Sequence, residues 1–226
     1  MNAETIARNI ETVKKQLRDN ARFEAVELCV VTKTQPVEAV NAVYDAGIHR
    51  IGENRVQEIL QKLPTLNPRL LVDLIGQLQT NKVKYIVDCV SRVQSLDRMS
   101  LAQALDTRCK QAGRVMPCLV QVNIAREVQK SGLDEDKLID FLRQASKLTG
   151  IRIEGLMAIM PLTADPREIR PYFKQMRVWF DRLREEAIEG IGMDVLSMGM
   201  SGDYVMAVQE GSTLVRVGSA IFGARS

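Results

Sequence analysis

The stretch ELCVVTKTQPVEAVNAVYDAG, residues 27–47, contains the two kinds of element from which the rest of the chain is built. Its opening run, LCVV, is apolar and rich in valine, as is typical of a buried strand. Pro36 suits the first turn of a helix, and Gly47 suits the point where that helix stops. The stretch therefore predicts a strand over residues 27–34 that is followed by a helix.

The same alternation of apolar strand-like runs and amphipathic helical stretches continues along the chain. Eight strands are predicted, over residues 27–34, 50–52, 70–76, 92–95, 116–122, 152–159, 195–198 and 213–217. Eight strands that alternate with helices imply a parallel sheet, and at 226 residues the expected α/β fold is a closed (β/α)8 TIM barrel. A doubly wound open sheet is the alternative, although the glycine fingerprint of dinucleotide-binding folds is absent. An extra helix over residues 3–18 precedes the first strand, and no linker divides residues 1–226, so a single domain is expected.

Composition narrows the class of protein. The chain is 46% hydrophobic and 26% charged, with a net charge of +3 and no lysine or arginine block, which argues against nucleic-acid and membrane binding. The polar start of the chain is no signal peptide, and the four cysteines lie far apart without a CxxC motif. With a single histidine, a zinc site is not expected. These features predict a reduced, cytoplasmic protein, and the absence of heptads favours a monomer.

Lys33 stands at the end of the first predicted strand, where a lysine is unusual. Functional sites of such barrels lie at the C-terminal ends of the strands, and closure would bring the eighth strand, with Arg216, beside the first. Two interpretations remain open from position alone. Lys33 could be a solvated or ion-paired charge at the barrel rim. In a cationic, partly apolar setting it could instead be a nucleophilic amine that forms a Schiff base with an aldehyde.

The segments that follow strands seven and eight, SMGMSGD and VRVGSAIFG, contain glycine and serine. Barrel phosphate sites often form from these two loops, because glycine lets a phosphate approach backbone N–H groups and serine adds a hydroxyl. The candidates are Met200, Ser201, Gly202, Gly218 and Ser219. The alternative is that these residues only make turns and helix caps. Lys130, on the long loop after strand five, is either a solvated charge or a second amine near the site.

Eight motifs together resemble the pyridoxal phosphate homeostasis protein family. In chain order they are VVTKTQPVEAV, IGENRVQE, LIGQLQTNK, QSLDR, VNIAREVQKSGL, IEGLMAIMP, LSMGMSGDYVMAV and GSTLVRVGSAIFGAR. They run from residue 28 to residue 225, so the resemblance covers nearly the whole chain. The family is similar in fold to the barrel domain of alanine racemase and of fold-type III decarboxylases, but without their second domain.

The resemblance implies a set of cofactor-binding residues. Lys33 would form a covalent aldimine with pyridoxal 5′-phosphate (PLP), Ser201, Gly218 and Ser219 would bind its phosphate, and Arg216 would lie by its pyridine nitrogen. The remaining residues that the resemblance implies for the site are Asn54, Met198 and Met200. One departure is Asp73, where many members have a histidine, so any role of that histidine is in doubt here.

The function that the resemblance implies is homeostasis of PLP within the cell. The protein would hold the cofactor as a reversible Schiff base and buffer or deliver it, with transient contacts to PLP-dependent enzymes and no turnover of its own. A low-activity PLP-dependent amino-acid racemase or lyase is the alternative. The sequence offers two candidate acid or base groups: His49 is expected at the opposite end of the barrel, and Tyr204 on a helix face.

Overall fold

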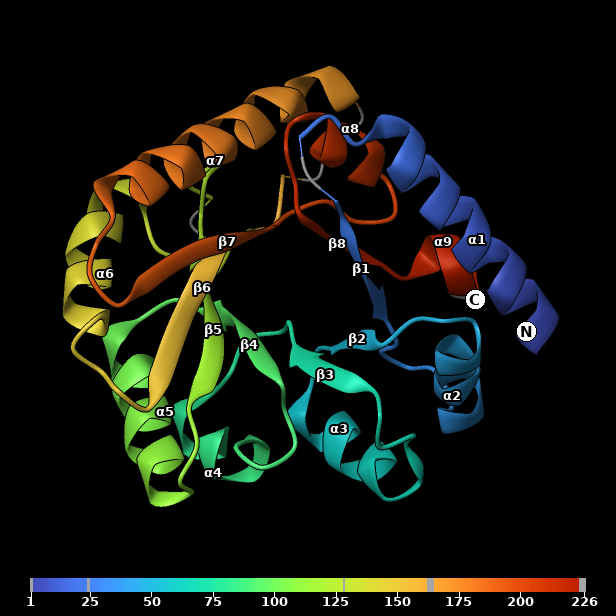
Figure 1. The fold of residues 1–226 in the computed structure, drawn as a ribbon, viewed down its shortest axis with the longest axis horizontal. Coiled ribbons are helices and arrows are strands. Elements are labelled where there is room, and N and C mark those ends of the chain that lie inside the picture. Colours follow the sequence, from blue (N-terminus) through green and yellow to red (C-terminus); the bar gives the residue numbers. More distant parts are fainter. Residues whose placement is uncertain (1, 24, 128, 162–164, 224–226) are drawn as a thin grey trace.

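A computed structural model describes residues 2–23, 25–127, 129–161 and 165–223 of the chain. Within these residues, eight parallel strands close into a barrel in chain order, and helices surround it (Figure 1). The predicted (β/α)8 barrel is confirmed, and the open sheet is not formed. Strand β8 lies beside β1, as closure requires.

The elements alternate as the sequence predicted. The strands are β1 (Glu27–Val31), β2 (Arg50–Glu53), β3 (Leu71–Leu74), β4 (Arg92–Leu96), β5 (Met116–Val122), β6 (Ile151–Ala158), β7 (Ile191–Ser197) and β8 (Leu214–Val217). The α-helices are α1 (Ala3–Asn20), α2 (Val37–Asp45), α3 (Val56–Lys62), α4 (Val83–Ile86), α5 (Met99–Gln111), α6 (Leu138–Ala145), α7 (Pro166–Glu186), α8 (Tyr204–Gln209) and α9 (Ser219–Phe222). Short 3-10 helices lie at η1 (Leu63–Thr65), η2 (Thr80–Lys82) and η3 (Glu135–Lys137).

Several element boundaries differ from the sequence prediction; β3, for example, covers residues 71–74 and not 70–76. Strand β1 ends at Val31, so Lys33 lies in the turn after the strand, where Thr34 has a φ of 65° that no strand can continue. Strand β7 begins at Ile191, well before the predicted start at residue 195. Helix α8 has Asp203 as its N-cap residue, so Ser201 is not the N-cap residue of that helix.

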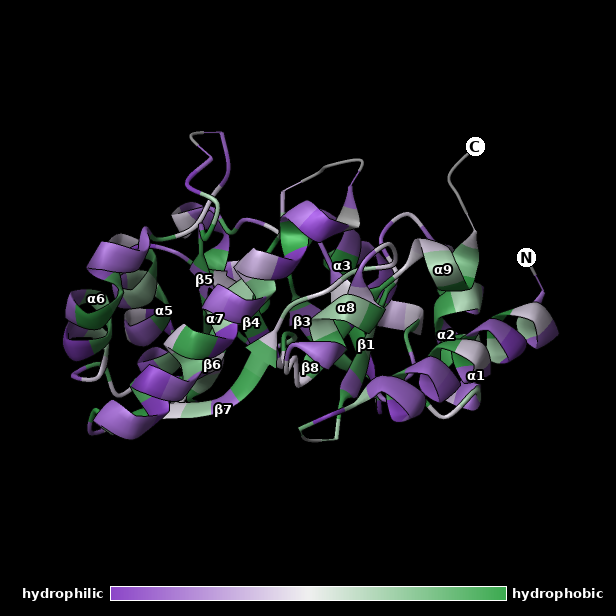
Figure 2. Ribbon diagram, turned by 90° about the horizontal axis from the view of Figure 1, so that it is seen from above, coloured by the Kyte–Doolittle hydropathy of each residue, from purple (hydrophilic) through white to green (hydrophobic). Residues whose placement is uncertain are grey.

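Apolar residues at helical spacing hold the outer ring against the strands. Helix α1 buries Ile6, Ile10, Val13 and Leu17 and exposes its polar face, a pattern that the outer helices repeat (Figure 2). Helices α1 and α9 lie side by side, and the Asn9 side-chain amide donates to the Ile221 carbonyl at 2.8 Å (Figure 1). The extra helix therefore packs beside the segment that follows β8. In the described part of the chain, no helix is long and apolar enough to span a membrane.

Candidate cofactor-binding site

A cavity of about 600 Å³ opens at the C-terminal ends of the strands, and we call it the mouth. Its size is within the range of about 300–1,000 Å³ that small-molecule sites occupy. The predicted site residues that line it are Lys33, Asn54, Met200, Ser201, Arg216, Gly218 and Ser219. Met198 is different, because its side chain is fully buried in the hydrophobic core and is not among the lining residues. A contact of Met198 with a bound cofactor stays a prediction.

The turn that carries Lys33 is held on both sides by charged residues of β2 and α3. The Lys62 ammonium donates to the Thr32 carbonyl at 2.8 Å, and the Thr32 hydroxyl donates to the Glu53 carboxylate at 2.7 Å. The backbone N–H of Thr34 donates to the Glu58 carboxylate. These contacts maintain the left-handed conformation of Thr34, which is unfavourable for a β-branched residue. The position of Lys33 is thus set by its two neighbours in the chain.

One of these contacts is with a carboxylate that is almost completely buried. Glu53 is 1% exposed, and its Oε1 atom accepts from both Thr32 and Lys62, each at 2.7 Å. Burial raises the pKa of Glu53, and the hydrogen bonds from Lys62 and Thr32 act in the opposite direction. The same Lys62 ammonium also donates to Glu58 at 2.8 Å. The motif GENRVQE therefore contributes a structural ion-pair cluster beneath Lys33.

The loops after β7 and β8 meet at a single oxygen atom. The Ser201 hydroxyl oxygen accepts the backbone N–H of Gly218 at 3.1 Å and that of Ala220 at 3.2 Å. Backbone N–H groups and hydroxyls are the donors that phosphate oxygens require, and in this structure the two N–H groups donate to the Ser201 hydroxyl. The structure brings together the two loops that the sequence proposed as a phosphate site.

Close backbone packing explains two of the glycines at the mouth. A β-carbon on Gly218, the residue after β8, would lie 3.1 Å from the Val31 carbonyl oxygen, so a larger residue would not fit easily there beside the end of β1. A β-carbon on Gly76 would lie only 2.2 Å from the Asn54 carbonyl oxygen, which is a direct clash. Gly76 thereby lets the segments after β2 and β3 pack together, and Asn54 stays at the wall of the cavity.

Arg216 forms part of the cavity wall from inside the barrel. It pairs in register with Cys29 of β1 and is 3% exposed. Its guanidinium donates to the Ala158 carbonyl at 2.8 Å, to the Ser197 carbonyl at 2.9 Å and to the Ser197 hydroxyl at 2.5 Å. Burial lowers the pKa of Arg216 to about 10, so the group is still protonated at neutral pH. The prediction that Lys33 and Arg216 share one mouth is confirmed.

Another part of the cavity wall contains polar residues, of which only Lys130 had been considered from the sequence as a residue near the site. It is polar and uncharged apart from one lysine, and its residues are Gln77, Gln121, Asn123, Gln129, Lys130 and Ser131. A polar Gln121 inside an otherwise apolar strand was the available signal. Lys130 does reach the mouth, where its ammonium donates to the Met160 carbonyl at 3.1 Å and pairs with Glu127.

Comparison with known proteins agrees with this geometry. The family model of the alanine racemase N-terminal domain matches residues 1–226. A protein of Aquifex aeolicus named pyridoxal phosphate homeostasis protein is 37% identical over 228 residues, which cover 100% of this chain and 99% of the relative. The structure of PipY from Synechococcus elongatus with PLP bound matches with a TM-score of 0.87 at 34% identity, over 96% of this chain and 100% of that one.

A more distant match shows the fold alone. Alanine racemase from Bartonella henselae is 16% identical with a TM-score of 0.75, and the match covers 99% of this chain but 60% of the racemase. The barrel is therefore shared with racemases, while the similarity along the full length is to the homeostasis proteins. On these grounds the chain belongs to the pyridoxal phosphate homeostasis protein family, within the alanine racemase N-terminal domain family.

Proposed function

We propose that this protein binds PLP reversibly at the mouth of its barrel and serves the homeostasis of that cofactor by holding and releasing it. One observation carries the proposal. Lys33 lines the same cavity as the two loops that meet at Ser201 and Gly218 and that are proposed to bind phosphate oxygens. When bound, the cofactor supplies an aldehyde carbon to which an amine nitrogen can add with the loss of one water molecule. Phosphate and aldehyde thus each have a fitting group on the chain.

Each lining residue has a distinct role in the proposal. Lys33 provides the amine, and it is oriented by the hydrogen bonds that Thr32 accepts from Lys62 and that Thr34 donates to Glu58. Ser201, Ser219 and the N–H groups of Gly218 and Ala220 bind the phosphate oxygens. Arg216, fixed by three hydrogen bonds, presents a cation from the interior of the barrel. Asn54 and Met200 form the side wall, where they limit the orientation of the ring.

The surroundings of two possible acid or base groups support binding without turnover. The Tyr204 hydroxyl donates to Gln16 of α1, and burial raises its pKa. His49 lies before β2, at the N-terminal end of the barrel, where its ring packs edge-on to Tyr44 with 5.2 Å between the ring centroids. Neither side chain lines the mouth. The proposal extends to a monomer that acts in the cytoplasm and passes the cofactor on during transient contacts with PLP-dependent enzymes.

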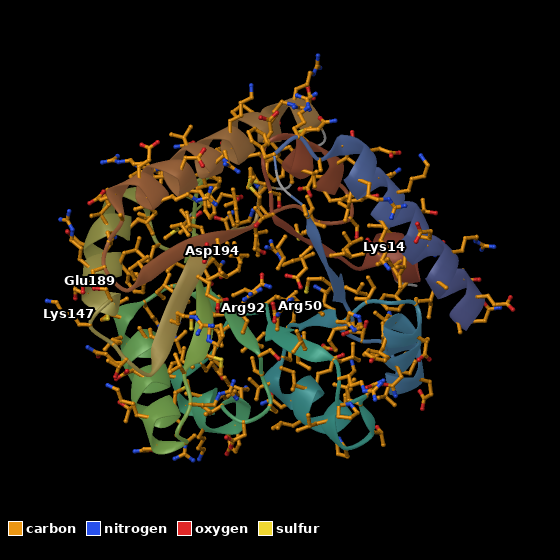
Figure 3. All side chains as sticks on the ribbon, in the orientation of Figure 1. Lys14, Arg50, Arg92, Lys147, Glu189 and Asp194 are labelled. Carbon is orange, nitrogen blue, oxygen red and sulfur yellow. The ribbon has the colours of Figure 1, made fainter. Side chains whose placement is uncertain are left out.

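The test is a visible spectrum of the protein after incubation with PLP, followed by borohydride reduction and identification of the modified peptide. We expect an absorption band of a Schiff base and a reduced adduct on Lys33. In Lys33→Ala the band should be lost completely, because the nucleophile is gone. The matched control is Lys147→Ala, at an exposed lysine on the outside of the barrel, which should keep the full band (Figure 3).

Two outcomes would contradict the proposal. An unchanged band in Lys33→Ala, with native circular dichroism, would mean that another group holds the cofactor. Rapid turnover would favour the racemase or lyase alternative. Loaded protein is therefore incubated with single L-amino acids while D-isomers and keto acids are measured. A rate above about 1 per second, which is at the lower range of typical enzymes, would reject the holding and releasing function.

A further inference from the structure

A continuous row of buried polar side chains crosses the interior of the barrel below the mouth. It starts at Arg216 of β8, whose guanidinium donates to the Ser197 hydroxyl of β7 at 2.5 Å. The Ser197 hydroxyl donates to the Gln94 carbonyl oxygen of β4 at 2.7 Å, and the Gln94 amide donates to the Asp73 carboxylate of β3 at 2.7 Å. Arg216 is 3% exposed and the other three residues are 0% exposed. The row connects strands that are not neighbours in the sheet, because β5 and β6 lie between β4 and β7.

The direction of the hydrogen bonds along this row is fixed by its two ends. A guanidinium can only donate, so the Ser197 hydroxyl must direct its own hydrogen toward Gln94. An ionised carboxylate can only accept, so the Gln94 amide nitrogen must face Asp73. Every donor therefore points from Arg216 toward Asp73. Such an aligned row places the positive charge at one end and the negative charge at the other, and aligned hydrogen bonds strengthen one another.

Asp73 is held in place at the far end by two arginines. Arg50 donates to it at 2.6 Å, and Arg92 lies 3.7 Å from its other oxygen. The Arg92 atom on that side, Nη1, is buried and has no hydrogen-bond partner among the described residues. Burial raises the pKa of Asp73, and the charges of Arg50 and Arg92 oppose that rise and favour the ionised carboxylate. The Asp73 carboxylate is thus flanked by the cations Arg50 and Arg92 on one side and accepts a hydrogen bond from the Gln94 amide on the other.

The three contacts of Arg216 itself are all with uncharged oxygens, on Ser197 and Ala158. We propose that Asp73, Gln94 and Ser197 are positioning residues that hold the Arg216 guanidinium in one orientation at the wall of the mouth, with Asp73 as the hydrogen-bond acceptor at the far end of the row. The inference rests on the proposed function for its effect on the cofactor. It assigns a role to Asp73, the position at which the sequence departs from the family pattern.

The decisive variant is Asp73→Asn, which removes a charge that is separated from Arg216 by two residues of the row, Ser197 and Gln94. The matched control is Glu154→Gln, the same chemical change at the same end of the barrel. Glu154 binds Arg92 at 2.9 Å but is not a member of the row. Ser197→Ala and Ser197→Thr form a second pair, in which only threonine retains the hydroxyl. This pair tests the inference if Asp73→Asn does not fold.

The first measurement uses the protein without cofactor. Nitrogen-15 NMR reports the hydrogen exchange and rotation of the Arg216 guanidinium. We expect a slowly exchanging, restricted group in the wild type and in Glu154→Gln. In Asp73→Asn and Ser197→Ala the hydrogen exchange of the guanidinium should be faster, whereas in Ser197→Thr it should be as slow as in the wild type. Equal behaviour of Asp73→Asn and Glu154→Gln would overturn the inference.

The second measurement is a titration with PLP, which gives both the affinity for PLP and the wavelength of the absorption maximum. Loss of the charge that aligns the row should weaken PLP binding about tenfold, as expected for one hydrogen bond to a charged group, and should shift the band maximum. The PLP affinity of Glu154→Gln should remain within about twofold of that of the wild type, a much smaller change than for Asp73→Asn. If the wild type forms no band, the proposed function fails while the NMR comparison still decides the role of the row. If the wild type binds PLP and Asp73→Asn binds it identically, the row does not position Arg216.

Discussion

The two ends of the barrel use similar charged residues in opposite ways. At the N-terminal end, Arg50 and Arg92 point from β2 and β4 toward the barrel interior (Figure 3) and pair with carboxylates. Arg50 binds Glu27 at 2.7 Å and Asp73 at 2.6 Å, and Arg92 binds Glu154 at 2.9 Å. At the mouth, Arg216 contacts only carbonyl and hydroxyl oxygens among the described residues, and Lys33 lies on the cavity wall.

The difference separates cations that stabilise the fold from cations that are available to a ligand. At the N-terminal end each buried cation lies against an anion of the same chain, so the attraction is used to hold strands together. At the mouth the cations face a cavity that an anionic ligand can enter. Carboxylates also lie near the mouth, where Glu127 pairs with Lys130 and where Glu53 and Glu58 bind Lys62. The Arg216 guanidinium differs from Arg50 and Arg92 because, among the described residues, its hydrogen bonds go to uncharged oxygens and not to a carboxylate.

The largest effect on stability is expected from Arg50→Met at the N-terminal end. The substitution leaves the fully buried Asp73 without its closest cation, and loss of one partner of a buried ion pair costs about 3–5 kcal/mol. Urea unfolding measures the loss. The matched control is Arg152→Met, whose side chain is 59% exposed in its pair with Glu154 and should contribute about 1 kcal/mol or less. Equal losses would mean that the two ends do not differ as described.

A smaller effect, dependent on pH, is expected from Asp106→Ala. The Asp106 carboxylate on α5 accepts the Gly150 N–H at 2.6 Å, directly before β6, and the Lys110 ammonium at 2.8 Å. Burial acts to raise the pKa of Asp106, but these hydrogen bonds outweigh it and lower the pKa below its ordinary value. Loss of the carboxylate should cost about 1–2 kcal/mol at neutral pH.

The sign of the pH dependence follows from that direction. Because the folded protein lowers the pKa of Asp106, the carboxylate stabilises the fold above the ordinary aspartate pKa of about 3.9. The contribution disappears as the pH falls through the lowered value. The gap between wild type and Asp106→Ala in urea unfolding should therefore close in acid. Glu189→Ala, at an exposed position (Figure 3), should show no such gap, and a gap for Asp106→Ala that widens in acid would contradict the assignment.

The smallest effect on the fold is expected at the mouth, from Ser201→Ala. The hydroxyl contacts Gly218 and Ala220 and is proposed to bind phosphate, so PLP affinity should fall about threefold to tenfold. The free energy of unfolding should change by about 1 kcal/mol or less. Titration with PLP and urea unfolding measure the two quantities. Ser212→Ala removes a hydroxyl that is buried against three carbonyl groups, and it should leave PLP affinity unchanged. Weaker PLP binding in Ser212→Ala together with unchanged binding in Ser201→Ala would mean that the phosphate binds elsewhere.

The sequence alone predicted the barrel because its strands and helices have local periodicities that do not depend on distant contacts. Alternating apolar runs marked all eight strands, and the closure that eight strands imply was enough to predict that Arg216 lies beside the first strand. The glycine and serine residues after strands seven and eight marked the loops that meet at Ser201. Boundaries were less certain, as the end of β1 shows, because Thr34 adopts its turn only when Glu58 of another element binds it.

Only the tertiary structure revealed the row from Arg216 to Asp73. Ser197 and Gln94 are 103 positions apart, and each is fully buried in a strand that also carries other polar residues. Local propensity carries no information about such a pair, since the barrel must close before the two side chains can meet. The sequence thus determined the order of the elements and the residue types at the strand ends, through short-range periodicity. The closed barrel decided which charges pair with one another and which face the cavity, because those pairings exist only across its interior.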